Sequence, residues 1–123
     1  MQQGRKSTRP AAAHQVDRGS RQLCVLIAVS VRLYRDGLAE ALSAHRRFRV
    51  EATAGDAADV VAASHRVQPD VVIVDVALVE ALTVIRGLRD QSNCRRILAF
   101  AVGDHVDALI QYAKAGADGF FSL

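Results

Sequence analysis

The chain is poor in several residue types that mark particular protein classes. Its 123 residues include no tryptophan, two prolines and two cysteines, and aromatic residues make up 5%. Two cysteines are too few to build a disulfide scaffold. No apolar run approaches the roughly 20 residues that span a bilayer. No apolar stretch follows the first basic residues, which excludes a signal peptide. We therefore expect a cytoplasmic domain with no membrane partner.

The excess of positive charge is confined to one end of the sequence. The formal net charge is +3, but residues 1–21 alone hold five basic residues and one acidic residue. This basic arm has almost no large apolar residue, so we predict that it is disordered. It either contacts an anionic partner or has no specific role. Residues 22–123 carry a net charge of −1, and on charge grounds we do not expect them to bind nucleic acid themselves.

Half of the chain is apolar, and these residues fall into an alternating pattern. Short apolar runs predict strands at 23–29, 48–54, 71–74, 97–102 and 119–123. Amphipathic stretches predict helices at 33–44, 56–66, 79–89 and 106–115. Three runs are apolar throughout, as a parallel strand covered by helices requires, whereas 48–54 alternates and is expected nearer an edge. The pattern predicts an α/β fold, a doubly wound, five-stranded parallel sheet of flavodoxin-like type in the order 2-1-3-4-5.

Local signals add detail to the predicted helices. Asp56 is the expected N-cap of the second helix, and Gly116 is expected just past the end of the fourth. In the first helix one side is expected to hold Leu33, Leu38, Ala41 and Leu42. In the third helix the apolar face is expected to start at Val79.

Ligands of doubly wound folds bind at the carboxyl ends of the strands, near the point where the strand order reverses. In this sequence, that rule points to the segment Val29–Ser30, to Asp75 and to Ala101. We find no glycine-rich phosphate loop, no pair of nucleophile and base, and no metal cluster.

Three segments resemble one family of signalling domains. Residues 26–38 are similar to a first strand and helix opening, 68–75 (QPDVVIVD) to a strand that ends in an aspartate, and 115–120 (AGADGF) to a later helix–strand junction. Together they resemble a response-regulator receiver domain of the NarL/LuxR family, which has a CheY-like fold. The resemblance covers about residues 22–123.

The resemblance implies a phosphorylation site, and this chain departs from it. Asp75 matches the phospho-acceptor aspartate. The positions of the acidic, Mg²⁺-holding pair are occupied by Val29 and Ser30, the hydroxyl position by Ala101, and the lysine position by Leu123. With both metal carboxylates absent, we expect neither Mg²⁺ nor any other cofactor, and no conventional phosphorylation at Asp75.

Further residues are candidates for a functional role. Phe120 matches the family's switch aromatic and is expected to be packed in one position. The nearest acidic substitutes are Asp36, expected to face solvent, and two more near the fourth helix, Asp104 and Asp107. Cys24 is expected to pack in the first strand, and Cys94, beside two arginines, to be a weak redox candidate. No metal spacing is shown by the four histidines, His14, His45, His65 and His105.

The resemblance also implies a fifth helix and, in a transcription regulator, a DNA-binding domain after the fifth strand. We expect both to be missing from this sequence, and we expect apolar surface on the first and fifth strands to be left uncovered. Any contact with DNA is expected to come from such a C-terminal domain, or weakly from the arm.

Three functional hypotheses follow. The first is a non-enzymatic regulatory domain that works without phosphorylation, through a homodimer, a protein partner or a small-molecule effector. The second keeps phosphorylation of Asp75 with non-standard metal ligation. The third is an enzyme or cofactor-binding domain on the same fold.

Overall fold

The computed structural model describes residues 21–91, 96–101 and 106–122. Among the residues considered above, the arm before residue 21, Cys94, Asp104, His105 and Leu123 lie outside the described residues. Within the described ranges, no helix is long and apolar enough to cross a membrane.

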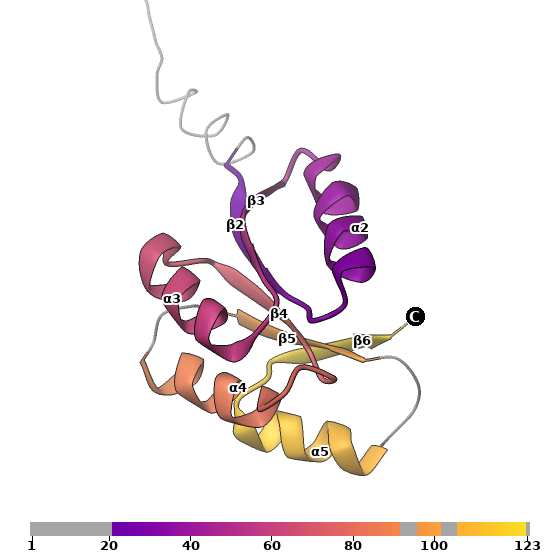
Figure 1. The fold of residues 1–123 in the computed structure, drawn as a ribbon, viewed down its shortest axis with the longest axis vertical. Helices are drawn as coiled ribbons and strands as arrows, with labels where there is room; N and C mark the ends of the chain where they lie inside the picture. The colour runs from indigo at the N-terminus through magenta and orange to yellow at the C-terminus, as the bar shows by residue number, and fades with distance from the viewer. Residues whose placement is uncertain (1–20, 92–95, 102–105, 123) are drawn as a thin grey trace, which may run out of the picture.

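The described residues form a five-stranded sheet with four helices (Figure 1). The strands are β2 (Leu23–Ala28), β3 (Phe48–Ala54), β4 (Val71–Asp75), β5 (Arg96–Ala101) and β6 (Gly119–Ser122). The helices are α2 (Arg32–Ser43), α3 (Ala57–Val67), α4 (Ala81–Asp90) and α5 (Val106–Ala115). All pairings are parallel, in the order β3-β2-β4-β5-β6. This is the predicted order 2-1-3-4-5, and the predicted fold class is confirmed.

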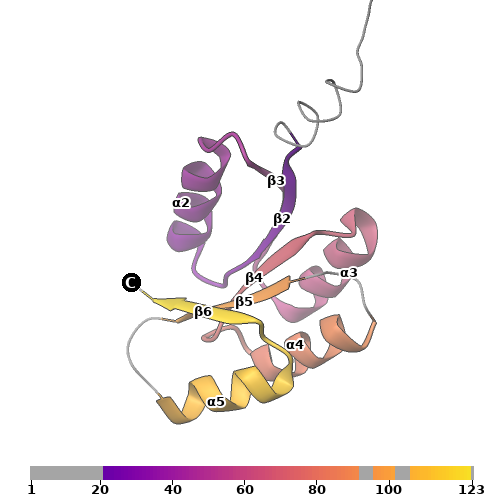
Figure 2. The ribbon, with the colours of Figure 1, turned by 180° about the vertical axis from the view of Figure 1, so that it is seen from behind.

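The two faces of the sheet are covered unequally. Helix α2 lies alone on one face, whereas α3, α4 and α5 cover the other (Figures 1 and 2). We call these the α2 face and the three-helix face. Among the described residues, the three-helix face buries fourteen in one cluster, and the α2 face buries five: Val25, Ile27, Val29, Ile73 and Phe100.

The expectation of uncovered apolar surface is wrong for the first strand beyond its first residue, Leu23, which is 40% exposed. Val25, Ile27 and Val29 are at most 1% exposed, because α2 and the neighbouring strands pack over the middle of the sheet. On the last strand, Phe121 is partly buried and its ring lies 4.9 Å from the ring of Phe100.

The strand predicted to lie near an edge, β3, is indeed an edge strand. Its side chains alternate between partly buried and exposed positions. The register shifts between Val25 and Leu26, whose partners are Val50 and Ala52, so Glu51 forms a bulge. Glu51 and Arg49 pair on this edge at 2.9 Å. Charges and bulges of this kind discourage pairing with another strand.

Helix boundaries follow local chemistry, with two corrections. The carboxylate of Asp56 accepts the Asp59 amide at 2.9 Å and caps α3 as predicted, and Gly116 at the end of α5 has φ +127°. The third helix starts at Ala81 rather than 79, because a turn precedes it, and Val79 is 78% exposed. In α2, the predicted face was partly wrong, since Leu33 is 77% exposed.

The remaining residues of α2 show which side faces the sheet. Leu38, Ala39 and Leu42 pack against the buried residues of the α2 face, and Ala41 is exposed. The true apolar side is therefore rotated away from Leu33 and Ala41.

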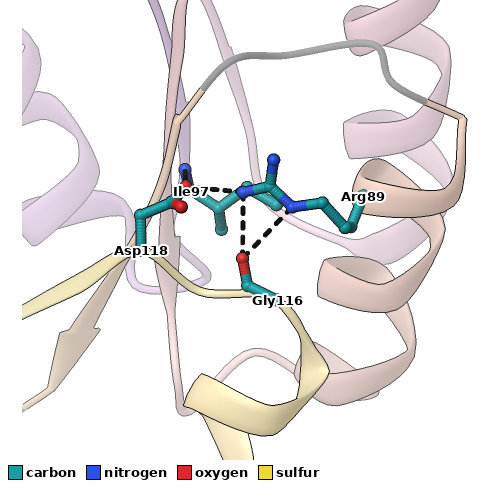
Figure 3. Close-up of polar contacts among 4 residues, drawn as sticks. All are labelled: Arg89, Ile97, Gly116 and Asp118. Atoms are coloured by element: carbon teal, nitrogen blue, oxygen red, sulfur yellow. Dashed lines mark hydrogen bonds and ion pairs between the residues drawn. The ribbon is translucent and has the colours of Figure 1, made fainter.

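A polar cluster joins α4 to the end of α5 and to β5 (Figure 3). Two guanidinium nitrogens of Arg89 donate to the Gly116 carbonyl at 2.9 and 3.3 Å, and Nη2 lies 2.5 Å from Asp118. The same Asp118 oxygen accepts the Ile97 amide at 2.8 Å. The φ of +127° at Gly116 favours glycine, and a Cβ there would also lie 3.1 Å from the Arg89 side chain, closer than an ordinary contact. The cluster holds the three-helix face together at its rim.

Candidate functional site

The candidate site is built around Asp75, the last residue of β4. This carboxylate is one of two polar side chains buried among the described residues, with 4% exposure. Its Oδ1 accepts the Ala77 amide at 2.9 Å. The other oxygen has no partner among the described residues. In register Asp75 lies beside Phe100, the largest fully buried side chain.

The loop that follows Asp75 is an ordered turn. Leu78 donates its amide to the Asp75 carbonyl at 2.9 Å, and Ala81 donates to Leu78 at 3.0 Å. The hydroxyl of Tyr112, from α5, donates to the Val76 carbonyl at 3.1 Å. Tyr112 therefore connects this loop directly to a helix more than thirty residues away in sequence.

The two positions expected for the acidic pair lie at the end of β2, one strand away from Asp75. Ala28 pairs with Val74, so Val29 follows at the level of Asp75. Val29 is fully buried and donates its amide to the Ala54 carbonyl at 3.1 Å, whereas Ser30 is exposed. A buried valine offers no ligand atom from its side chain.

Arg35 is a residue at this edge that the sequence analysis missed. Its Nη1 donates to the carbonyls of Val29 at 3.0 Å and Ser30 at 3.4 Å. Gly55 makes room for it, since a Cβ there would lie 2.5 Å from the same nitrogen. The feature that could have pointed to Arg35 is the first turn of α2, which has no acidic residue, no side-chain cap and two arginines. Such charges oppose the helix dipole and therefore suggest another role.

Other predicted site residues lie in separate places. Ala101 ends β5 and pairs with Ser122. Asp36 forms an exposed ion pair with Arg32 at 3.5 Å, as expected for a solvent-facing residue. Asp107 is exposed in the first turn of α5. The described residues contain no group of three or more His, Cys, Asp and Glu side chains that could hold a metal ion.

Phe120 is not packed as expected. It is 37% exposed, while its neighbour Phe121 lies against Phe100. Successive side chains of a strand point to opposite faces, so the two phenylalanines cannot share one environment. The partly buried aromatic of β6 is thus one residue later than expected.

Cys24 and His45 make contacts that fit a structural role. Cys24 is buried in β2 as predicted. Burial, together with the Glu51 carboxylate, raises the pKa of its thiol, which keeps it protonated and unreactive. The His45 ring packs against the Phe48 ring in a tilted arrangement, with 5.1 Å between ring centroids, and its Nδ1 accepts the Arg47 amide at 3.2 Å. His65 is exposed near the end of α3.

Solved structures with the same architecture identify the fold. The signal receiver domain of the response regulator NarL from Mycobacterium tuberculosis superposes with a TM-score of 0.77 at 24% identity, over 83% of this chain and 84% of that one. The fold is that of a response-regulator receiver domain. No family model matches the sequence, and no curated protein matches it.

Two more receiver structures agree. A LuxR-family two-component response regulator from Aurantimonas gives a TM-score of 0.76 at 21% identity, over 82% of this chain and 74% of that one. The receiver domain of RcsB from Salmonella enterica, solved with the phosphomimetic BeF₃⁻, gives 0.74 at 15% identity over 83% and 78%. At these identities the likeness establishes the receiver fold, and the function must be argued from the site.

Proposed function

We propose that this chain is a receiver-like regulatory domain of a transcription regulator that works without conventional aspartyl phosphorylation. Its output is dimerisation, docking to a protein partner or binding of a small effector, and any DNA-binding domain lies beyond these residues. The observation that supports this most is the Arg35 guanidinium, held on the Val29 and Ser30 carbonyls. At this place the resemblance implies two carboxylates.

The residues present do not fit Mg²⁺. Hard divalent cations take oxygen ligands, preferably carboxylates. The described part of this edge supplies the buried Asp75 carboxylate, but the adjacent strand ends in Val29. A guanidinium at the same strand end adds a repulsive positive charge, which matters more at a partly desolvated position than in bulk water.

An apolar rim at this end of the sheet supports docking or effector binding. Val31, Leu33 and Tyr34 at the start of α2 are 41–77% exposed, and Val79 in the loop after Asp75 is 78% exposed. Exposed apolar groups around a site favour an uncharged or amphipathic partner over a phosphoryl group.

The test is phosphorylation itself. The chain is incubated with acetyl phosphate and Mg²⁺, and its intact mass is recorded. We expect no gain of roughly 80 Da, the mass of one phosphoryl group. A gain that disappears in Asp75→Asn would overturn the proposal and establish the phosphorylatable alternative.

A gain-of-function variant makes a negative result informative. Ser30→Asp restores one carboxylate at an exposed position. Combined with it, Arg35→Ser removes the positive charge that repels Mg²⁺. We expect this variant to gain Mg²⁺-dependent mass or BeF₃⁻ binding. The matched control is Ser30→Asp with Arg32→Ser, which has the same formal charge but keeps Arg35. If both variants behave alike, the role assigned to Arg35 is wrong.

A further inference from the structure

The folded domain carries a basic patch at the amino edge of its sheet, opposite the Asp75 site. The patch consists of Arg21, Arg46, Arg47 and Arg49. All four are exposed. Arg21 lies just before β2, Arg46 and Arg47 lie in the turn between α2 and β3 (Figure 1), and Arg49 is the second residue of β3. The net charge of −1 for residues 22–123 conceals this local concentration.

Paired backbone segments bring the four arginines together. Leu23 pairs with Phe48, and its amide donates to the Arg47 carbonyl at 2.8 Å. The Gln22 side chain donates to the Arg46 carbonyl at 3.1 Å. Arg21 directly precedes Gln22, so it leaves the chain close to the Arg46–Arg47 turn. The four arginines therefore lie at the same end of the sheet, on its β3 side.

The turn that presents Arg46 and Arg47 is built rigidly. Ala44 donates its amide to Glu40, His45 donates to Leu42, and Phe48 donates to His45, at 3.0–3.2 Å. The His45 ring also accepts the Arg47 amide. The backbone thus holds the turn while both guanidinium groups project into solvent.

Little acidic charge offsets the patch. Glu51 pairs with Arg49, and Asp70 at the same edge uses its carboxylate to accept the Cys24 amide at 2.8 Å. Glu40, one turn before the end of α2, is the remaining nearby carboxylate. Arg21, Arg46 and Arg47 have no ion-pair partner among the described residues. The preceding sequence, residues 1–20, adds four more basic side chains.

We propose that this patch binds the phosphate backbone of DNA without reading its sequence. The patch is composed of arginine alone, whose planar guanidinium matches a phosphate with two parallel hydrogen bonds. A membrane surface fits less well, because binding there usually depends on an amphipathic helix that presents aromatic or leucine side chains beside its basic residues. The proposal goes beyond the proposed regulatory function and does not depend on it.

The experiment measures binding of the full chain to a labelled 20-base-pair DNA duplex by fluorescence anisotropy over a range of salt concentrations. Each phosphate contact contributes about −0.9 to the slope of log affinity against log salt. We expect Arg46→Ser/Arg47→Ser to reduce the slope by about 1.8 and to weaken binding about tenfold at low salt. Arg46→Lys/Arg47→Lys should retain most of the slope.

Two controls separate the patch from general charge. Arg32→Ser/Arg86→Ser changes the net charge equally at exposed positions on α2 and α4, and it should leave the slope unchanged. Replacing the four basic residues of 1–20 by serine should weaken binding but leave a slope that still responds to Arg46 and Arg47. Thermal unfolding should be unchanged in the Arg46/Arg47 variants, since the contacts of both residues are made through the backbone.

Three results would overturn the proposal. These are no binding to duplex at low salt, binding that Arg46→Ser/Arg47→Ser leaves intact, and binding to vesicles of anionic lipid without binding to DNA. If Arg32→Ser/Arg86→Ser weakened DNA binding as much as Arg46→Ser/Arg47→Ser, the patch would not be a distinct binding site, and the proposal would also be rejected.

Discussion

The two faces of the sheet use the same strands but are covered in different ways. On the three-helix face, α4 buries Ala81, Val84, Ile85 and Leu88. On the other face, α2 buries no residue completely, and Leu38 and Leu42 are only partly covered. A helix stabilises a sheet in proportion to the apolar area that it removes from water. Most of the folding free energy therefore resides on the three-helix face.

The contrast extends to the helix ends. Helix α3 has an aspartate cap, acidic charge in its first turn and basic charge in its last turn, all of which favour the helix dipole. Helix α2 has none of these. Its first turn instead supplies Arg35 to the strand ends. The side of the molecule with less buried apolar surface is thus the side that contributes Arg35 to the candidate site.

The largest expected effect tests the difference in burial. Ile85→Ala on α4 removes a fully buried side chain and should lower the free energy of unfolding by about 3–4 kcal/mol. Leu42→Ala on α2 removes a half-covered one and should cost about 1–2 kcal/mol. Urea unfolding at neutral pH measures both. Equal costs would show that the two faces contribute alike.

The polar cluster at the rim of the three-helix face should come next. Asp118→Ala leaves the Ile97 amide without its acceptor and Arg89 without its ion pair, so we expect a loss of about 2 kcal/mol. Asp36→Ala breaks the exposed pair with Arg32 and should cost less than about 0.5 kcal/mol. A cost for Asp36→Ala that matches Asp118→Ala would refute the distinction.

Capping provides a paired test with opposite signs. Asp56→Ala should destabilise the protein by about 1 kcal/mol, because α3 loses its N-cap. Val31 precedes α2 in an extended conformation that suits a cap, with no side-chain hydrogen bond. Val31→Asp should therefore stabilise by about 0.5–1 kcal/mol. Chemical denaturation measures the stability of both variants. A destabilising effect of Val31→Asp would contradict the conclusion that α2 lacks a cap which an aspartate can supply.

The smallest expected effect is a dependence on alkaline pH from Cys24. Its pKa is raised above the ordinary value of 9.0 in the folded protein. The thiol's contribution to stability is thus fully present below pH 9.0 and is lost as the pH rises through the folded-state pKa. Unfolding free energies from pH 7 to 10 are compared for Cys94→Ser and Cys94→Ser/Cys24→Val. As the pH rises, the free energy of unfolding of Cys94→Ser should fall relative to that of Cys94→Ser/Cys24→Val. A constant difference between the two proteins would exclude this linkage.

The pattern of the sequence predicted the strands well, because each is a short apolar run between turn signals. It predicted Asp56 as a cap for the same local reason. It misplaced Leu33 and Val79, since spacing alone does not tell where a helix begins or which side meets the sheet. At the site, Asp75, Val29 and Ser30 were located by the rule that ligands bind at strand ends and then by the resemblance, but Arg35 was not. Its role depends on Gly55, which is twenty residues away in sequence.

Sequence by itself determined the order of strands and helices, the position of Asp75 at a strand end, and the absence of carboxylates at residues 29 and 30. These are local properties of composition and spacing. Only the tertiary structure decided that Arg35 lies on the end of β2, that Tyr112 holds the loop after Asp75, and that Gln22 lies against the turn at Arg46. Those contacts join segments distant in the chain, and parallel strand pairing is what brings them together.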